Sequence, residues 1–151
     1  MNMMSDPNAA RKEWLGLLAR SAPAEVARLW HALEIDPPHS LLRAPEIGGV
    51  MVRGRAGAVG AAFNLGEMTV TRASVKLADG SVGHGYVQGR NKDHAVQAAL
   101  VDALMQTDTA ADIEGGMLKP LRDEMRARQT DRAAKAAATK VDFFTMVRGE
   151  D

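Results

Sequence analysis

Apolar side chains recur at helical spacing near the start of the chain and predict two helices. The first covers 6–20, because Asp6 followed by Pro7 is typical of a capped helix start. The second begins at 21–23 and ends before Pro37 and Pro38, and we expect the two to form an antiparallel helical hairpin. The apolar residues of the two stripes are Trp14, Leu17 and Leu18 in the first helix, and Val26, Leu29, Trp30 and Leu33 in the second.

The middle of the chain is predicted to be β-structure. Short strands are expected over 40–44 and 50–55, and a longer strand over 67–78 follows a glycine-rich loop. Asp79-Gly80 is predicted as a two-residue hairpin turn, with 81–89 as the return strand. If Ala78 lies opposite Ser81, one face of the hairpin points into the core. That face carries Thr71, Ala73, Val75, Leu77, Val82, His84, Tyr86 and Gln88.

The opposite face of the predicted hairpin is nearly bare of side chains. Alternating glycines weaken a strand, so they indicate that something approaches the backbone closely. Two candidates stay open, which are a helix of this same chain and a partner or ligand. On this face we select four residues as candidates for partner docking: Lys76, Gly83, Gly85 and Gly89.

The last third of the chain is expected to be mainly helical. A capped helix is predicted from Asn91 or Asp93 to about Thr107, and 113–118 is ambiguous because two glycines interrupt it. The segment 119–139 has good helix propensity but few apolar residues. The tail 141–147 holds two of the three Phe residues, and it has to be buried in its own domain or against another chain. The tail residues selected as docking candidates are Phe143, Phe144, Met146 and Arg148.

Together these elements predict a single α+β domain over 1–151, with 140–151 as a docking tail. Its parts are the N-terminal helical hairpin, an antiparallel β-sheet with an Asp-Gly hairpin, C-terminal helices and the apolar tail.

Composition narrows the possible functions. Lys plus Arg and Asp plus Glu both number 19, so no overall charge attracts nucleic acid or an anionic membrane. Cysteine is absent, which excludes a disulfide scaffold, a cysteine nucleophile and a cysteine-ligated iron–sulfur cluster. No apolar run approaches the ~20 residues of a membrane span, and no signal peptide is recognisable. We therefore expect a cytoplasmic protein.

Residues with catalytic chemistry are few. The four histidines have neither the spacing of a metal site nor partners for a triad, so no catalytic residue and no metal ligand is assigned. Gly89 to Lys92 joins a strand to a helix, and the N–H groups at a helix start favour anions. The other interpretation is that Asn91 only caps the helix. The candidates for contact with phosphate are Arg72, Arg90, Lys92 and His94.

Three stretches of the sequence resemble the PhnG family, a subunit of the bacterial carbon–phosphorus lyase core complex. They are 57–106, 14–30 and 140–151, and the motifs TRASVKLADG, YVQGRNKDHA, ALVDALMQ and VDFFTMVRG occur in the family's order. The resemblance covers nearly the whole chain, and the C-terminal motif is its most specific part. Asn91 stands where the family commonly has Asp, and both residues can cap a helix.

The resemblance implies a role in using phosphonates as a phosphorus source. It implies partners that resemble PhnI, PhnH and PhnJ, with a PhnL-like ATPase required for activity. ATP with Mg²⁺ would be a substrate of the assembly, and no cofactor would be bound by this chain. An alkylphosphonate would displace adenine from ATP, giving α-D-ribose 1-alkylphosphonate 5-triphosphate. The family supplies no catalytic residue to carry over.

Three hypotheses follow from the sequence. The first is a non-catalytic subunit that docks through the glycine face and the tail. The second is a subunit that contributes cations to a phosphate-binding site shared with a partner. The third is a nucleic-acid-binding module that uses 119–140, and scarce aromatic residues weigh against it.

Overall fold

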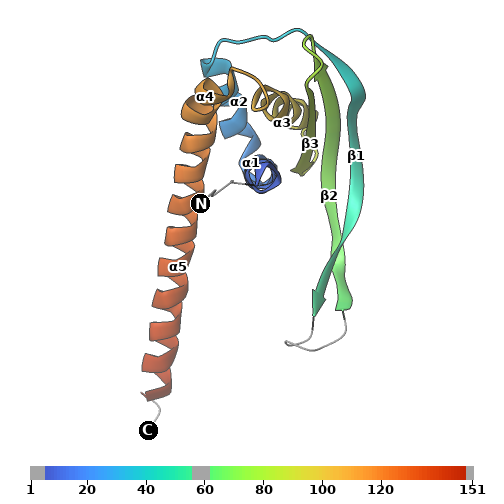
Figure 1. Ribbon diagram of the computed structural model, residues 1–151. Helices are drawn as coiled ribbons and strands as arrows, with labels where there is room; N and C mark the ends of the chain where they lie inside the picture. The colour runs from blue at the N-terminus through green and yellow to red at the C-terminus, as the bar shows by residue number, and fades with distance from the viewer. Residues whose placement is uncertain (1–5, 56–61, 149–151) are drawn as a thin grey trace.

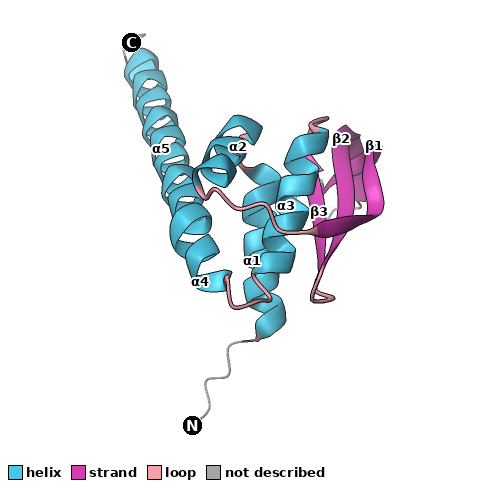
Figure 2. Cartoon of the chain, turned by 90° about the horizontal axis from the view of Figure 1, so that it is seen from above, coloured by secondary structure: helices cyan, strands magenta, loops and turns pink. Residues whose placement is uncertain are grey.

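The computed structural model describes the backbone of residues 6–55 and 62–148, and the side chains of 6–54 and 66–140. The architecture is α+β, as predicted (Figure 1). Viewed from above in Figure 2, the sheet lies on one side, α3 and α1 come next, and α5 is outermost. The elements in chain order are α1 (Pro7–Arg20), α2 (Pro23–Ala32), β1 (His39–Arg55), β2 (Ala62–Leu77), β3 (Val82–Gln88), α3 (Lys92–Leu104), α4 (Ala110–Ile113), the π-helical turn η1 (Glu114–Leu118) and α5 (Lys119–Arg148).

Helices α1 and α2 begin as the sequence indicates, but they do not form an antiparallel hairpin. The Asp6 side chain accepts a hydrogen bond from the backbone N–H of Asn8, and proline occupies the first turn of both helices. In Figure 1, α1 is seen nearly down its axis whereas α2 is seen from the side. Both helices contact α3. The shared apolar surface of α3 therefore sets their arrangement.

Strand β1 is continuous where two short strands were predicted. It pairs with β2 along its length, and Gly48 and Gly49 lie within the pairing, opposite Val70 and Thr69. The sheet order is β1-β2-β3, so β1 is an edge strand. Pro45 falls where the register is irregular, which is a position that proline tolerates because an edge strand can spare an N–H donor.

The register of the β2–β3 hairpin differs by one residue from the prediction. Leu77 lies opposite Ser81 and donates to its carbonyl, so the connection is three residues long and ends at Gly80 with φ +95°. A shift of one residue turns a strand over relative to its neighbour. Consequently His84 and Tyr86, expected in the core, are exposed on the far face, whereas Gly83, Gly85 and Val87 face inward.

The core forms where α3 packs on the sheet. An added Cβ on Gly83 would lie 1.9 Å from the Ala99 carbonyl oxygen, and one on Gly85 would lie 2.0 Å from that of Ala95. Only glycine lets the helix approach this closely. Of the two candidates for what covers the glycine face, the helix of this same chain is therefore the correct one, and that helix is α3. Gly83 and Gly85 are not available to a partner, which corrects their selection as docking residues.

The Gly115-Gly116 pair does not break the C-terminal helices. It lies in η1, which joins α4 to α5 through helical backbone. An added Cβ on Gly116 would lie 2.6 Å from Cδ2 of Leu33, so this glycine makes room for the end of α2. Beyond η1, α5 extends well past the rest of the fold (Figure 1). Its residues 131–140 are all exposed.

Candidate functional site

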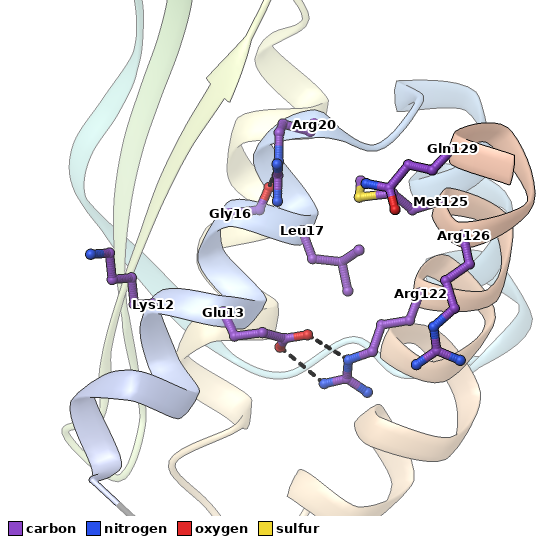
Figure 3. Close-up of a pocket in the computed structure, with 9 residues that line it drawn as sticks. All are labelled: Lys12, Glu13, Gly16, Leu17, Arg20, Arg122, Met125, Arg126 and Gln129. Carbon is purple, nitrogen blue, oxygen red and sulfur yellow. Dashed lines mark hydrogen bonds and ion pairs between the residues drawn. The ribbon is translucent and has the colours of Figure 1, made fainter. Parts of the chain in front are cut away.

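A groove lies between α1 and α5 in the described structure. Its first pocket has a volume of about 250 Å³. Figure 3 shows Glu13 and Leu17 of α1 facing Arg122 and Met125 of α5 across it. The groove exists because α5 touches α1 near its own start and then continues past it.

Arg122 braces this groove. Its Nε donates to Oε1 of Glu13 at 2.6 Å, and its guanidinium also pairs with Glu114. The hydrogen bonds from Glu13 and Glu114 raise the pKa of Arg122 above its ordinary value. Both acceptors of this cation belong to the same chain, so its role is to hold α5 against α1 and η1.

A second pocket of about 210 Å³ adjoins the first and shares Arg20, Met125 and Gln129 with it. Among the described residues, three arginines and no carboxylate line this pocket. We call it the arginine pocket, and its lining residues are Arg20, Gln88, Met125, Arg128, Gln129 and Arg132. Sequence reasoning missed it because its residues come from α1, β3 and α5. The available signal was the spacing of 125, 128, 129 and 132, which places them on one helix face.

Asp102 is the centre of a polar network in the core. It is fully buried, and Arg11 donates to both of its oxygens, at 3.0 and 2.8 Å. The Trp14 indole and the backbone N–H of His84 donate as well, both at 2.8 Å. The carboxylate thus ties α1, α3 and β3 together, and its four donors satisfy it structurally. A lone acid in the apolar run 95–104 was the sequence signal.

The four phosphate-contact candidates are not gathered into one site. Arg90 and Lys92 are exposed at the turn between β3 and α3, where the side chain of Asn91 caps α3 by accepting from the His94 N–H. Arg72 lies on β2, and its guanidinium carbon is 5.9 Å from the ring centre of the exposed Tyr86.

His94 is the fourth candidate, and it lies inside the core, only 1% exposed. Its Nε2 donates to the Leu18 carbonyl at 2.8 Å, and its buried Nδ1 has no partner among the described residues. Burial lowers the pKa of His94, because the charged ring would lose its hydration. This histidine is a neutral core residue and is not placed to contact a phosphate.

The remaining docking candidates differ in what surrounds them. Lys76 and Gly89 are exposed, and Gly89 has φ +94° with open space around it. The backbone of the tail candidates continues α5 to Arg148. The side chains of Phe143, Phe144, Met146 and Arg148 lie outside the described part of the structure.

An exposed apolar stripe on β1 was not predicted. Leu41 pairs with Val75 and Ile47 with Thr71, so the stripe continues the face that α3 covers on β2. Its three members are Leu41, Ile47 and Met51, which are 49%, 43% and 54% exposed. The apolar face of the sheet therefore extends beyond its helical cover onto an edge strand.

Within the described residues no three His, Asp or Glu side chains are grouped so as to hold a metal ion. None of the described helices is both long enough and apolar enough to span a membrane.

Comparison with known proteins gives the family of the chain. The family model described as "Phosphonate metabolism protein PhnG" matches residues 9–149. A relative from Rhizobium meliloti (strain 1021), the "Alpha-D-ribose 1-methylphosphonate 5-triphosphate synthase subunit PhnG", is 44% identical over 143 residues. The alignment covers 95% of this chain and 92% of that relative. This chain therefore belongs to the PhnG family of phosphonate metabolism proteins.

Proposed function

We propose that this chain is an accessory subunit of the enzyme that makes α-D-ribose 1-methylphosphonate 5-triphosphate, within a carbon–phosphorus lyase core complex. The observation that carries the proposal is the match along 95% of the chain with a relative that is itself named as a subunit of this synthase. The partners would be PhnI-, PhnH- and PhnJ-like chains, with a PhnL-like ATPase for activity. ATP with Mg²⁺ would be the substrate of the assembly, and adenine would be released.

The exposed surfaces support a role in assembly. Burying the stripe of Leu41, Ile47 and Met51 would remove apolar surface from water at about 25 cal/mol per Å². The edge of β1 that faces away from β2 also offers backbone groups to another strand. The exposed part of α5 adds a second surface, continuous with the predicted docking tail.

Co-expression tests the proposal. The tagged chain, produced together with its neighbouring genes, should copurify with PhnI-, PhnH- and PhnJ-like chains identified by mass spectrometry. A variant with Leu41, Ile47 and Met51 changed to Ser should recover much less of them. Arg43→Ser with Glu46→Ser is the matched control, since both residues are exposed and lie on the opposite face of the same strand. A chain that always purifies alone would contradict the proposal.

In a second candidate function, cations near the turn between β3 and α3 contribute to a phosphate-binding site shared with a partner chain. Arg90 and Lys92 are exposed beside the start of α3, where the helix dipole favours an anion. Replacing Arg72, Arg90 and Lys92 singly with Ala in the reconstituted assembly should slow adenine release if they reach a shared site. Unchanged turnover in an intact assembly would rule this candidate out.

A further inference from the structure

The charge pattern of the arginine pocket differs from that of neighbouring positions on the described part of α5. Elsewhere on this helix, Arg126 pairs with Asp123 at 3.8 Å and Lys135 pairs with Asp131 at 3.1 Å. Arg128 and Arg132 are four residues apart on one face and repel each other. Among the described side chains, no carboxylate pairs with either of them or with Arg20. The pocket therefore concentrates positive charge that the described carboxylates do not neutralise.

One of these guanidinium groups also lacks a hydrogen-bond acceptor. The Nε of Arg128 is buried and has no partner among the described residues. A donor that is buried without an acceptor loses its hydration and gains no hydrogen bond in return, so the free pocket is an unfavourable arrangement for this group. A bound anion would remove that cost. Arg20 is already oriented for binding an anion. Its Nε donates to the Gly16 carbonyl at 3.1 Å, and this bond orients its outer nitrogens.

We propose that the arginine pocket binds the phosphate groups of a polyphosphate-bearing small molecule, with Arg20, Arg128 and Arg132 as its anchors. The identity of the anion rests on the proposed function, because the relative's enzyme is named for a 5-triphosphate. The lining of the pocket, by contrast, is observed in this chain and does not depend on the proposed function.

The chemistry of the lining fits this ligand. Guanidinium groups present a planar fork of donors that matches phosphate oxygens, and they stay charged at every physiological pH. The side-chain amides of Gln88 and Gln129 can donate further hydrogen bonds, and Met125 supplies an apolar wall. The adjoining pocket of about 250 Å³ continues the groove and leaves room for more than one phosphate group.

Binding to the purified chain tests the site directly. Titration calorimetry with inorganic tripolyphosphate should show saturable binding that weakens as salt is raised. Inorganic phosphate should bind more weakly, because it reaches fewer of the arginines. Tripolyphosphate and ATP should bind alike if the phosphates alone are recognised.

Charge variants distinguish binding in the arginine pocket from nonspecific electrostatic attraction. Arg128→Gln with Arg132→Gln should weaken tripolyphosphate binding by roughly tenfold or more. Arg128→Lys keeps the charge but loses the fork, so a smaller loss is expected. The matched control is Arg28→Gln with Lys135→Gln, which removes two charges at residues that do not line the pocket. This control should stay within about twofold of the unchanged chain.

The outcomes distinguish this proposal from the proposed function. No saturable binding, or equal losses in the pocket variant and the control, would overturn the phosphate site even if partner chains copurify. Loss of partner chains in the pocket variant, without tripolyphosphate binding by the unchanged chain, would assign the pocket to an acidic segment of a partner and also overturn it. Tripolyphosphate binding without copurifying partners would leave the site standing and contradict the proposed function.

Discussion

The inner half of the molecule, where α1, α2 and α3 pack on the sheet, is held together by contacts among its own residues, whereas the outer half, made of the edge strand β1 and the end of α5, leaves apolar and charged side chains exposed. In the inner half, α3 lies on the sheet and Asp102 receives four donors from three elements. In the outer half, the side chains of 131–140 on α5 are exposed, and those of the β1 stripe are about half exposed. The contrast indicates a subunit whose core is complete alone and whose surface is completed in an assembly.

The largest expected effect is a loss of stability when a buried group of the inner half is removed. Asp102→Ala leaves the Arg11 guanidinium and the Trp14 indole without their buried acceptor, so the free energy of unfolding should fall by roughly 3–5 kcal/mol. Urea denaturation followed by circular dichroism measures it. Asp131→Ala is the control, because its pair with Lys135 is exposed and should be worth less than about 1 kcal/mol. Equal effects of the two changes would erase the contrast between the halves.

The close approach of α3 to the sheet gives the next effect. Gly83→Ala places a Cβ against the backbone of Ala99, which cannot move without lifting the helix, so we expect a loss of about 1–3 kcal/mol. Gly49→Ala is the matched control on the edge strand. There the three atoms nearest to the new Cβ all belong to the side chain of Glu67, which can rotate away, and the loss should be smaller. A harmless Gly83→Ala would mean that α3 does not press on this strand.

A smaller effect should appear as pH dependence. Burial lowers the pKa of His94 in the folded protein, so the unfolded chain takes up a proton near its ordinary value of about 6.5 while the folded protein does not. Stability should therefore fall as pH drops below about 6.5, and level off below the folded pKa. Denaturation across this range measures the slope, and His94→Gln should reduce it. An undiminished slope in that variant would assign the proton uptake to other groups.

The smallest effect on stability is expected in the outer half. Because 131–140 are exposed, ending the chain after Lys140 should change the free energy of unfolding by no more than about 0.5 kcal/mol. The same truncation should reduce the recovery of copurifying partners, if the tail docks against another chain. A large loss of stability would show that Phe143 and Phe144 pack within their own domain, which was the other interpretation of the tail.

The sequence by itself determined the order of most elements and several of their ends. Asp6-Pro7 and Asn91 set helix starts through local bonds between neighbouring residues, which need no distant partner. The hairpin position followed from Asp79-Gly80 in the same way. The glycine alternation of β3 also indicated a close backbone approach, and the sequence left open what approaches.

Tertiary structure decided the features that depend on distant residues. The one-residue shift of the β2–β3 register follows from burying Val87 and placing Gly83 under α3, and it turned His84 outward. The burial of Asp102 needed donors from α1 and β3. The arginine pocket needed α5 to pass the end of α1, bringing Arg20 beside Arg128 and Arg132. Local sequence sets backbone propensity, but only packing decides which side chains are buried together and which charges remain unpaired.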